Sequence, residues 1–388
     1  MTASILAVAS LFGQDSGNNS NSKACMDATK NKQEKCARSF EQGQDILKSQ
    51  AMPSYLAPAT TQVRGSWDLF VTGSFIYWQP TQDNMEYGLT NTLYQGNVSG
   101  PTTATGLKGT WLEQSFSFQP GFKVGVGLNT EHDNWDLFAE YTWLRDETSS
   151  SSKGPTTGDI LATRGISVNA AGTTVANVFT SASQSWTCNL DFLNLEMGRG
   201  CYFGRALTMR PAFGVRGTLI RQKLNSTYTN ASITTNNALP GVATVQDYVH
   251  SWSVGPRAAL YSNWLVGSRF RLYGNVAGDA TFTQYDMKYN HQFILTTGAA
   301  AGQNTKYASS EHDLGVLRGH IEMELGFGWG SYFDNDNWYF DVSAGYTWQI
   351  FFDQNMFREY GTTNPARGTL TNGNLYINGL TANVRFDF

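Results

Sequence analysis

The chain has 388 residues, a formal net charge of −4, 15% charged residues and 13% aromatic residues. A soluble domain usually carries about 25% charged residues, whereas a transmembrane barrel replaces many of them with an apolar outer band and aromatic girdles. The acidic balance lacks the basic footprint that a nucleic-acid partner would require. No run of about 18 apolar residues occurs, which excludes a transmembrane helix but leaves a membrane barrel open.

The N-terminal region differs in character from the rest of the chain. Residues 4–13 form an apolar run of signal-peptide length, although no basic residues precede it, and an Asn/Ser-rich stretch follows. We therefore expect a signal-like segment and polar linker over residues 1–22, with a disordered N-terminus as the alternative. A partly helical leader is expected over residues 23–60.

The four cysteines do not suggest a disulfide framework. In a continuous leader helix, Cys25 and Cys36 would lie on one face but about 16 Å apart along the axis. That separation exceeds the roughly 7 Å between Cα atoms that a disulfide allows, so they can pair with another chain or stay free. Cys188 and Cys201 are expected near opposite rims of the barrel and therefore apart.

From residue 65 onward, apolar and polar residues alternate with a period of two, which is typical of strands with two different faces. In the first such segment Leu69, Val71 and Phe75 share one parity, and Thr72 and Ser74 the other. Strands of about 13 residues, tilted near 40°, would span about 33 Å and cross an outer membrane. Ten segments show the pattern: residues 67–77, 116–128, 135–143, 186–199, 207–219, 252–260, 269–282, 317–329, 338–350 and 380–388.

The connections between these segments alternate in length. Four are short and would be periplasmic turns: residues 129–134, 200–204, 262–267 and 330–337. Five are long and polar and would be extracellular loops: residues 79–110, 145–185, 222–247, 288–311 and 353–372. This asymmetry and the even strand number predict an all-β fold, a transmembrane antiparallel β-barrel of about ten strands over residues 61–388.

Aromatic rings gather at both ends of the apolar series. Trp135 and Trp338 lie toward the turns, and Tyr77, Trp143 and Trp252 toward the loops. Amphipathic rings favour both membrane interfaces, which supports a membrane barrel over a soluble sandwich.

Several motifs, taken in their order along the chain, indicate a family. They are GSWDLFVTGSFIYW from Gly65, QPGFKVGVG from Gln119, DFLNLEMGR from Asp191, RPAFGVR from Arg210 and the terminal LTANVRFDF. Over roughly residues 60–388 the chain resembles the major outer-membrane proteins of Legionella and of chlamydia-related bacteria. The resemblance implies an abundant, surface-exposed envelope barrel with porin activity, embedded in outer-membrane lipid.

The resemblance also implies partners. The last strand is similar to the C-terminal signal read by the outer-membrane assembly machinery, with aromatic rings at Phe386 and Phe388. The family further implies a homo-oligomer that disulfides can link. The leader with Cys25 and Cys36 matches no pattern of the family, so intermolecular disulfides through these two residues are suggested only by their chemistry.

Charged residues of both signs occupy the inward parity. In a water-filled lumen they would set charge preference, which favours a porin for passive diffusion of small hydrophilic solutes. In a ten-stranded barrel the same charges can instead pair and close a narrow lumen, and the alternative is a surface adhesin or a structural envelope barrel without an open pore. The pore-lining candidates are Lys123, Arg210, Arg216, Arg257, Arg271, Arg318, Glu322, Glu324, Asp341 and Arg385.

An enzyme is the rival from another class, because some ten-stranded barrels are surface proteases that use acidic residues and a histidine. The candidates here are Asp247, His250, His312 and Asp313. The first two are three residues apart and the last two adjacent, so on strands each pair faces opposite sides. With no metal-binding or nucleophile-elbow motif either, we expect no catalysis, no metal and no cofactor.

Overall fold

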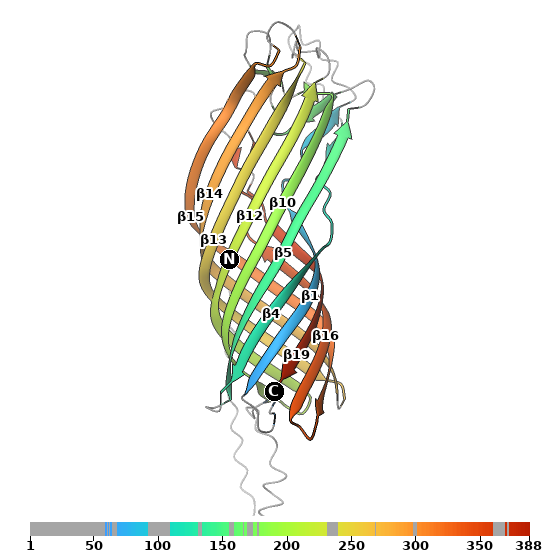
Figure 1. Ribbon diagram of the computed structural model, residues 1–388, viewed down its shortest axis with the longest axis vertical. Helices are drawn as coiled ribbons and strands as arrows, with labels where there is room; N and C mark the ends of the chain where they lie inside the picture. The colour runs from blue at the N-terminus through green and yellow to red at the C-terminus, as the bar shows by residue number, and fades with distance from the viewer. Residues whose placement is uncertain are drawn as a thin grey trace, which may run out of the picture. The chain divides into compact units, whose positions relative to one another are not determined.

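The computed structural model describes residues 59, 61, 63, 68–91, 109–130, 134–154, 159–165, 167–168, 174–176, 178–230, 240–267, 269–297, 301–359, 369–370 and 372–388. They belong to the compact unit Tyr55–Phe388. Most of this unit is one antiparallel barrel (Figure 1). Its strands are β1 (Leu69–Gln82), β4 (Gln119–Asn129), β5 (Trp135–Lys153), β10 (Ser181–Arg199), β12 (Leu207–Asn230), β13 (Gly241–Leu265), β14 (Phe270–Leu295), β15 (Asn304–Phe333), β16 (Trp338–Phe351) and β19 (Leu375–Asp387).

The first and last of these strands close the ring. β1 pairs with β19 from Phe70 opposite Asp387 to Gln82 opposite Leu375, and the Phe388 N–H donates to the Leu69 carbonyl at 3.1 Å. A spanning sheet must close in this way because lipid offers no partner for the hydrogen-bonding groups of an open edge. The predicted all-β fold and the ten-stranded antiparallel barrel are confirmed.

The predicted alternation also assigns the two faces correctly in the lower part of the barrel. On β4, for example, Phe122, Val124 and Val126 are exposed on the outside, whereas Lys123 is buried inside. The short turns are confirmed near their expected places, at residues 130–134, 200–206, 266–269 and 334–337, and the second of these contains the short strand β11 (Cys201–Phe203).

Four strands are about two to three times as long as the sequence predicted. β12, β13, β14 and β15 have 24, 25, 26 and 30 residues, and they rise with β5 and β10 above the other strands (Figure 1). The expected loops at residues 222–247 and 288–311 were therefore wrong, because strands occupy all but their central parts. β5 and β10 likewise extend into the expected loop at residues 145–185, and β1 into the one at residues 79–110.

A reversal of hydrophobic parity explains why these extensions were missed. On β14, Phe282 is exposed on the outside, whereas Tyr285, Met287 and Tyr289 are buried on the inside. Lipid surrounds the lower part of the strand and water the upper part, so the apolar side chains change face. The outward apolar series therefore ends at Phe282, and a strand predicted from that series ends there too.

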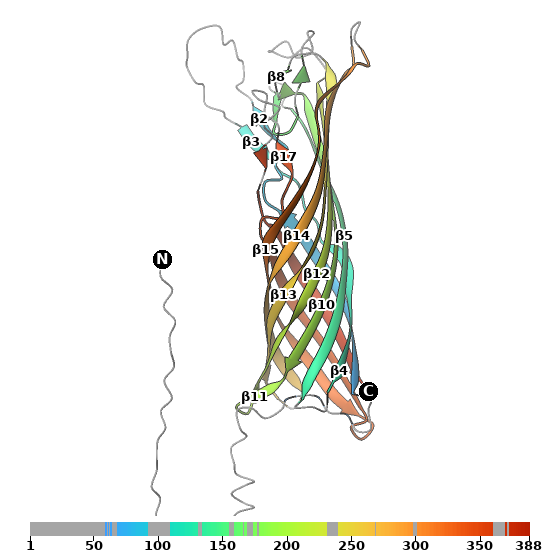
Figure 2. The same ribbon diagram turned by 90° about the vertical axis from the view of Figure 1, so that its left-hand side faces the viewer.

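Short strands from the connections cover the inner face of the tall wall. β2 (Gly88–Asn91), β3 (Gly109–Leu112), β6 (Asp159–Ala162) and β9 (Val178–Phe179) form a small sheet beside the upper wall (Figure 2). Two further two-stranded pieces pair β7 (Ser167–Val168) with β8 (Thr174–Ala176) and β17 (Arg358–Glu359) with β18 (Thr369–Leu370). Ile160 and Phe179 pack against Tyr228 and Phe293 of the wall. Burial raises the pKa of the Tyr228 hydroxyl to about 12, and this group donates to the Tyr87 carbonyl at 2.9 Å.

Several expectations concern residues outside this description. The signal-like segment, nearly all of the leader, Cys25 and Cys36 lie there, so the export signal and the intermolecular disulfides stay predictions. Cys188 and Cys201 are buried free thiols. Cys201 on β11 lies at the turn end, as expected, whereas Cys188 lies partway along β10 in a buried apolar cluster and not at a rim. Among the described residues, no helix is long and apolar enough to cross a membrane.

The parity reversal predicts where a new charge is tolerated on β15. Met323 is exposed on the outside in the middle of the apolar series, and Ser309 is exposed on the outside above it. Met323→Lys is expected to lower the free energy of unfolding from lipid vesicles by about 2–4 kcal/mol, whereas Ser309→Lys should leave it nearly unchanged. Urea titration of the two variants measures this, and equal losses would contradict the assigned membrane boundary.

Candidate functional site in the barrel lumen

A cavity of about 810 Å³ lies inside the lower barrel and reaches the turn-side rim, where Tyr202, Asp336 and Ala59 line it. Alternation along the strands directs charged side chains into this space, because the outward positions are apolar. Eight of the pore-lining candidates line the cavity: Lys123, Arg210, Arg257, Arg271, Glu322, Glu324, Asp341 and Arg385.

A network of ion pairs, which we call the ion-pair belt, extends from the turn side of the cavity to its upper end. One series of contacts starts at Asp136 on β5, which binds the Arg210 guanidinium at 2.8 Å. Arg210 in turn approaches Glu196 at 3.6 Å, and Glu196 binds Arg257 at 2.7 Å. The belt consists of Lys123, Asp136, Glu140, Glu196, Arg210, Arg216, Arg257, Asp279, His320 and Glu322.

Glu322 joins the two sides of the lumen. Its carboxylate lies 3.2 Å from Arg257, 3.4 Å from Arg216 and 3.7 Å from Lys123. Lys123 is on β4, four strands away from β15 around the ring, and it also approaches Glu140 at 3.6 Å. The belt therefore crosses the lumen instead of following one wall, and its charges are largely neutralised within it.

Arg216 occupies the most buried position of the belt. Its side chain is 1% exposed and does not line the cavity. It contacts Asp279 at 3.2 Å and the His320 Nδ1 at 2.8 Å, and it lies over the Phe192 ring. The sequence assigned Arg216 to the pore wall, but the structure places it above the cavity, under a layer of aromatic rings.

Separate ion pairs line the rest of the cavity. Arg271 on β14 binds Asp341 on β16, with one contact at 2.7 Å, and the Tyr273 hydroxyl donates to Glu324 at 2.6 Å. Arg385 stacks on the Phe70 ring at 3.8 Å. The cavity thus presents paired charges and aromatic hydroxyls to its interior.

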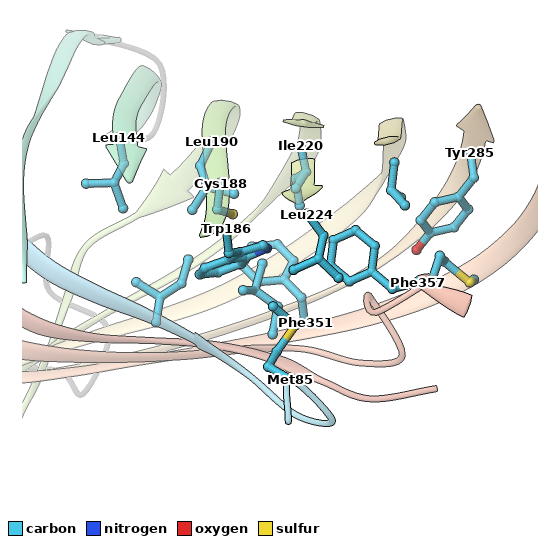
Figure 3. Close-up of a cluster of buried hydrophobic side chains, with 14 of the residues drawn as sticks. Met85, Leu144, Trp186, Cys188, Leu190, Ile220, Leu224, Tyr285, Phe351 and Phe357 are labelled. Atoms are coloured by element: carbon cyan, nitrogen blue, oxygen red, sulfur yellow. The ribbon is translucent and has the colours of Figure 1, made fainter. Parts of the chain in front are cut away.

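Above the belt the lumen is filled by apolar side chains, which we call the apolar plug. Trp186 and Leu224 project from the tall wall toward Met85, Phe351 and Phe357 (Figure 3). Each of these five side chains is at most 6% exposed. Met85 and Phe357 come from the connections that follow β1 and β16, so parts of two loops lie inside the barrel.

Residues 354–357 form the inserted segment of the plug, and hydrogen bonds hold it to the wall. Gln354 accepts from the Tyr285 hydroxyl at 3.0 Å and donates to Ser251 at 3.1 Å. Tyr289 donates to the Met356 carbonyl at 2.6 Å. Arg318 lies at this level, where it pairs with Asp353 at 3.3 Å. Arg318 therefore contacts the loop and not the cavity, unlike most of the other candidates.

The sequence analysis missed two groups of this interior. Glu196 was not assigned because the alternation of β10 is less regular, although Leu193 and Leu195 outside would have placed it inside. Asp247 binds His291 at 2.6 Å with both side chains fully buried. That pair was missed because residues 288–311 were expected to form a loop.

The four protease candidates do not form one site in the described structure. Asp247 is buried on the inner face of β13, whereas His250 is exposed on the outer face. His312 and Asp313 are exposed on β15, and no contact joins them to His250 within the described part. That same part contains no group of His, Cys, Asp or Glu side chains that could hold a metal ion. The absence of catalysis stays a prediction.

A closed barrel with an apolar outer band, short turns on one rim and a charged interior defines an integral outer-membrane protein of bacteria. The chain belongs to the family of the Legionella pneumophila major outer membrane protein precursor, whose family model matches residues 60–388. The protein is therefore located in the bacterial outer membrane, and the suspected family is confirmed. No curated protein sequence matches the chain.

Solved barrels resemble the chain only distantly. The outer membrane protease OmpT of Escherichia coli is 9% identical, with 85% of this chain and 99% of that chain covered and a TM-score of 0.42. A FadL homologue of Pseudomonas aeruginosa is 9% identical, with 87% and 96% covered and a TM-score of 0.28. The toluene transporter TbuX of Ralstonia pickettii is 10% identical, with 82% and 89% covered and a TM-score of 0.24. None of these likenesses informs function.

The contacts of the belt predict that removing a single charge strongly lowers the free energy of unfolding. Glu322→Gln leaves Lys123, Arg216 and Arg257 short of one counter-charge, and we expect a loss of about 3–5 kcal/mol in the free energy of unfolding. Glu311→Gln removes the partner of Lys288 in an exposed pair and should cost at most about 1 kcal/mol. Urea titration in lipid vesicles compares the two, and a small loss for both would indicate a hydrated belt.

Proposed function

We propose that the protein is a channel for passive diffusion of small hydrophilic solutes across the outer membrane, closed in the described conformation. The observation that carries this proposal is the cavity of about 810 Å³ with its charged lining. A barrel with a purely structural role has no need of a polar space of this size, because apolar side chains could fill it.

The cavity lining suits polar solutes of either charge. Arg271 and Arg385 offer donors, Glu324 and Asp341 offer acceptors, and Tyr273 offers a hydroxyl. A solute that enters from the turn side would exchange its polar contacts with water for polar contacts with the lining, so the free-energy cost of its desolvation would be small.

The way out toward the loops is closed by the inserted segment rather than by the wall alone. The inserted segment begins close to where the chain returns to the wall, since the Asp353 N–H donates to Asn374 Oδ1 at 3.0 Å and the Asn355 N–H donates to the Gly373 carbonyl at 2.9 Å. The connection between residues 353 and 374 therefore has adjacent ends. It can leave the lumen without disturbing β16 or β19, so the inserted segment is the part of the plug that we expect to move.

The belt favours a second candidate function. Because the Lys123–Glu322 contact crosses the lumen beneath the plug, a structural envelope barrel without an open pore remains the alternative. The hypothesis of a surface adhesin is supported only by the composition of the loops, and no contact in the described structure favours it. Conductance separates the two candidates that the lumen supports.

A loop replacement tests the channel. Replacing residues 354–373 by a short Gly-Ser turn joins positions that are already adjacent, and it removes Met356 and Phe357 from the plug. In planar bilayers we expect brief openings from the unaltered protein and a several-fold higher mean conductance from the variant, because part of the plug is gone.

The matched control replaces residues 231–240, which connect Asn230 to its direct partner Gly241, with the same turn. This variant should conduct like the unaltered protein. Closed bilayers with all three proteins, each verified as folded by its resistance to unfolding in detergent, would contradict the channel and favour the structural barrel.

A further inference from the structure

Basic side chains mark the upper border of the apolar band on one side of the barrel. On β5 the outward series ends at Trp143 and continues with Arg145, and on β12 it ends at Leu219 and continues with Arg221 and Lys223. On each strand the first outward residue above the band is therefore an arginine. At this upper border of the apolar band, the acyl chains of a bilayer end and the headgroups begin.

Strand pairing brings these residues into one patch. Asn189 on β10 lies directly opposite Arg145 on one side and Arg221 on the other. Arg221 is opposite His250 on β13, and Thr187 is opposite Lys223. Neighbouring strands are about 4.8 Å apart, and the four basic side chains lie on three of four adjacent strands: β5, β12 and β13, with β10 between the first two. We call Arg145, Arg221, Lys223 and His250 the basic border.

The protein neutralises only part of the basic border. Arg145 binds both oxygens of Asp191 at 2.8 and 2.9 Å and stacks on Trp143 at 4.9 Å. Lys223 lies over the Tyr248 ring at 5.2 Å. Within the described part of the chain, no carboxylate is within ion-pair distance of Arg221 or Lys223, and Arg221 is exposed.

The strands that follow β13 around the ring have a different charge at the corresponding place. The same row of paired residues continues from His250 to Asp286 on β14 and Asp313 on β15, and both are exposed. Lys288, the next outward cation on β14, is paired with Glu311 at 3.5 Å. Unpaired positive charge is thus concentrated over β12, beside the paired arginine of β5.

We propose that the basic border binds the phosphate-bearing headgroup of a membrane lipid. Arg221 and Lys223 are two residues apart on one face of β12, about 6.8 Å along the strand, so one phosphate can contact both. Arginine binds phosphate with two parallel hydrogen bonds, and the Asn189 and Thr187 side chains can contribute polar contacts between the strands. The apolar residues Trp143, Leu219 and Trp252 below hold the acyl chains, which a free anion lacks.

Native mass spectrometry of the full-length protein in uncharged detergent tests this proposal. The probes are bis-phosphorylated lipid A, the same lipid without phosphates, and inorganic phosphate. We expect retention of the phosphorylated lipid to weaken about 10- to 30-fold in the Arg221→Gln/Lys223→Gln double variant, because each cation near an anionic headgroup contributes about tenfold or less. The control Lys288→Gln, which removes a cation already paired, should bind like the unaltered protein.

The other outcomes overturn the proposal. Equal retention by the double variant, or equal retention of the lipid without phosphates, would show that the basic border does not recognise a headgroup. Displacement of the lipid by inorganic phosphate at similar concentration would show an anion site that needs no lipid. Since the variants lie outside the lumen, their conductance should be unchanged, which separates this result from the test of channel function.

Discussion

Closure of the sheet by β1 and β19 is the constraint on which the rest of the structure depends. In lipid, each backbone N–H and C=O must find its partner within the protein, and pairing Phe70 with Asp387 removes the last free edge. A ring of ten strands is only slightly wider than the eight-stranded ring that side chains fill completely. Charged side chains four strands apart can therefore meet, as Lys123 and Glu322 do at 3.7 Å. The ion-pair belt is a consequence of ring size.

The solvent on each side decides which face of a strand is apolar, and it changes along β14. Phe282 faces lipid, but three residues further Tyr285 turns inward, away from water. The upper wall then has an apolar inner face that water must not reach, and segments of the loops supply the cover. The insertion of Met85 and Phe357 into the lumen thus follows from the height of β12 to β15. A shorter barrel would have no apolar inner surface to cover.

Alternation predicted the strands in the membrane, the turns and the inward position of residues such as Lys123 and Arg271, because lipid enforces one apolar face. It could not predict contacts, since inward direction does not specify height or partner. Arg318 points inward like Lys123 but lies beside Asp353 of a loop. The Asp247–His291 pair joins residues 44 positions apart, and it depends on strand extensions whose apolar parity had reversed. The inserted segment, residues 354–357, has no period at all, so only tertiary packing places it.

The two closures of the lumen differ in what opening would cost. Ion pairs that become hydrated lose little, because exposed pairs are worth about 0–1 kcal/mol. Moving Met356 and Phe357 into water would cost roughly 1.5–3 kcal/mol for each side chain, besides the wall surface that they uncover. A free-energy difference of several kcal/mol leaves the open form as a minor population of less than about one per cent. In a channel of the kind that we propose, the plug and not the belt would set how often it conducts, and the charged cavity would act only on solutes that arrive during an opening.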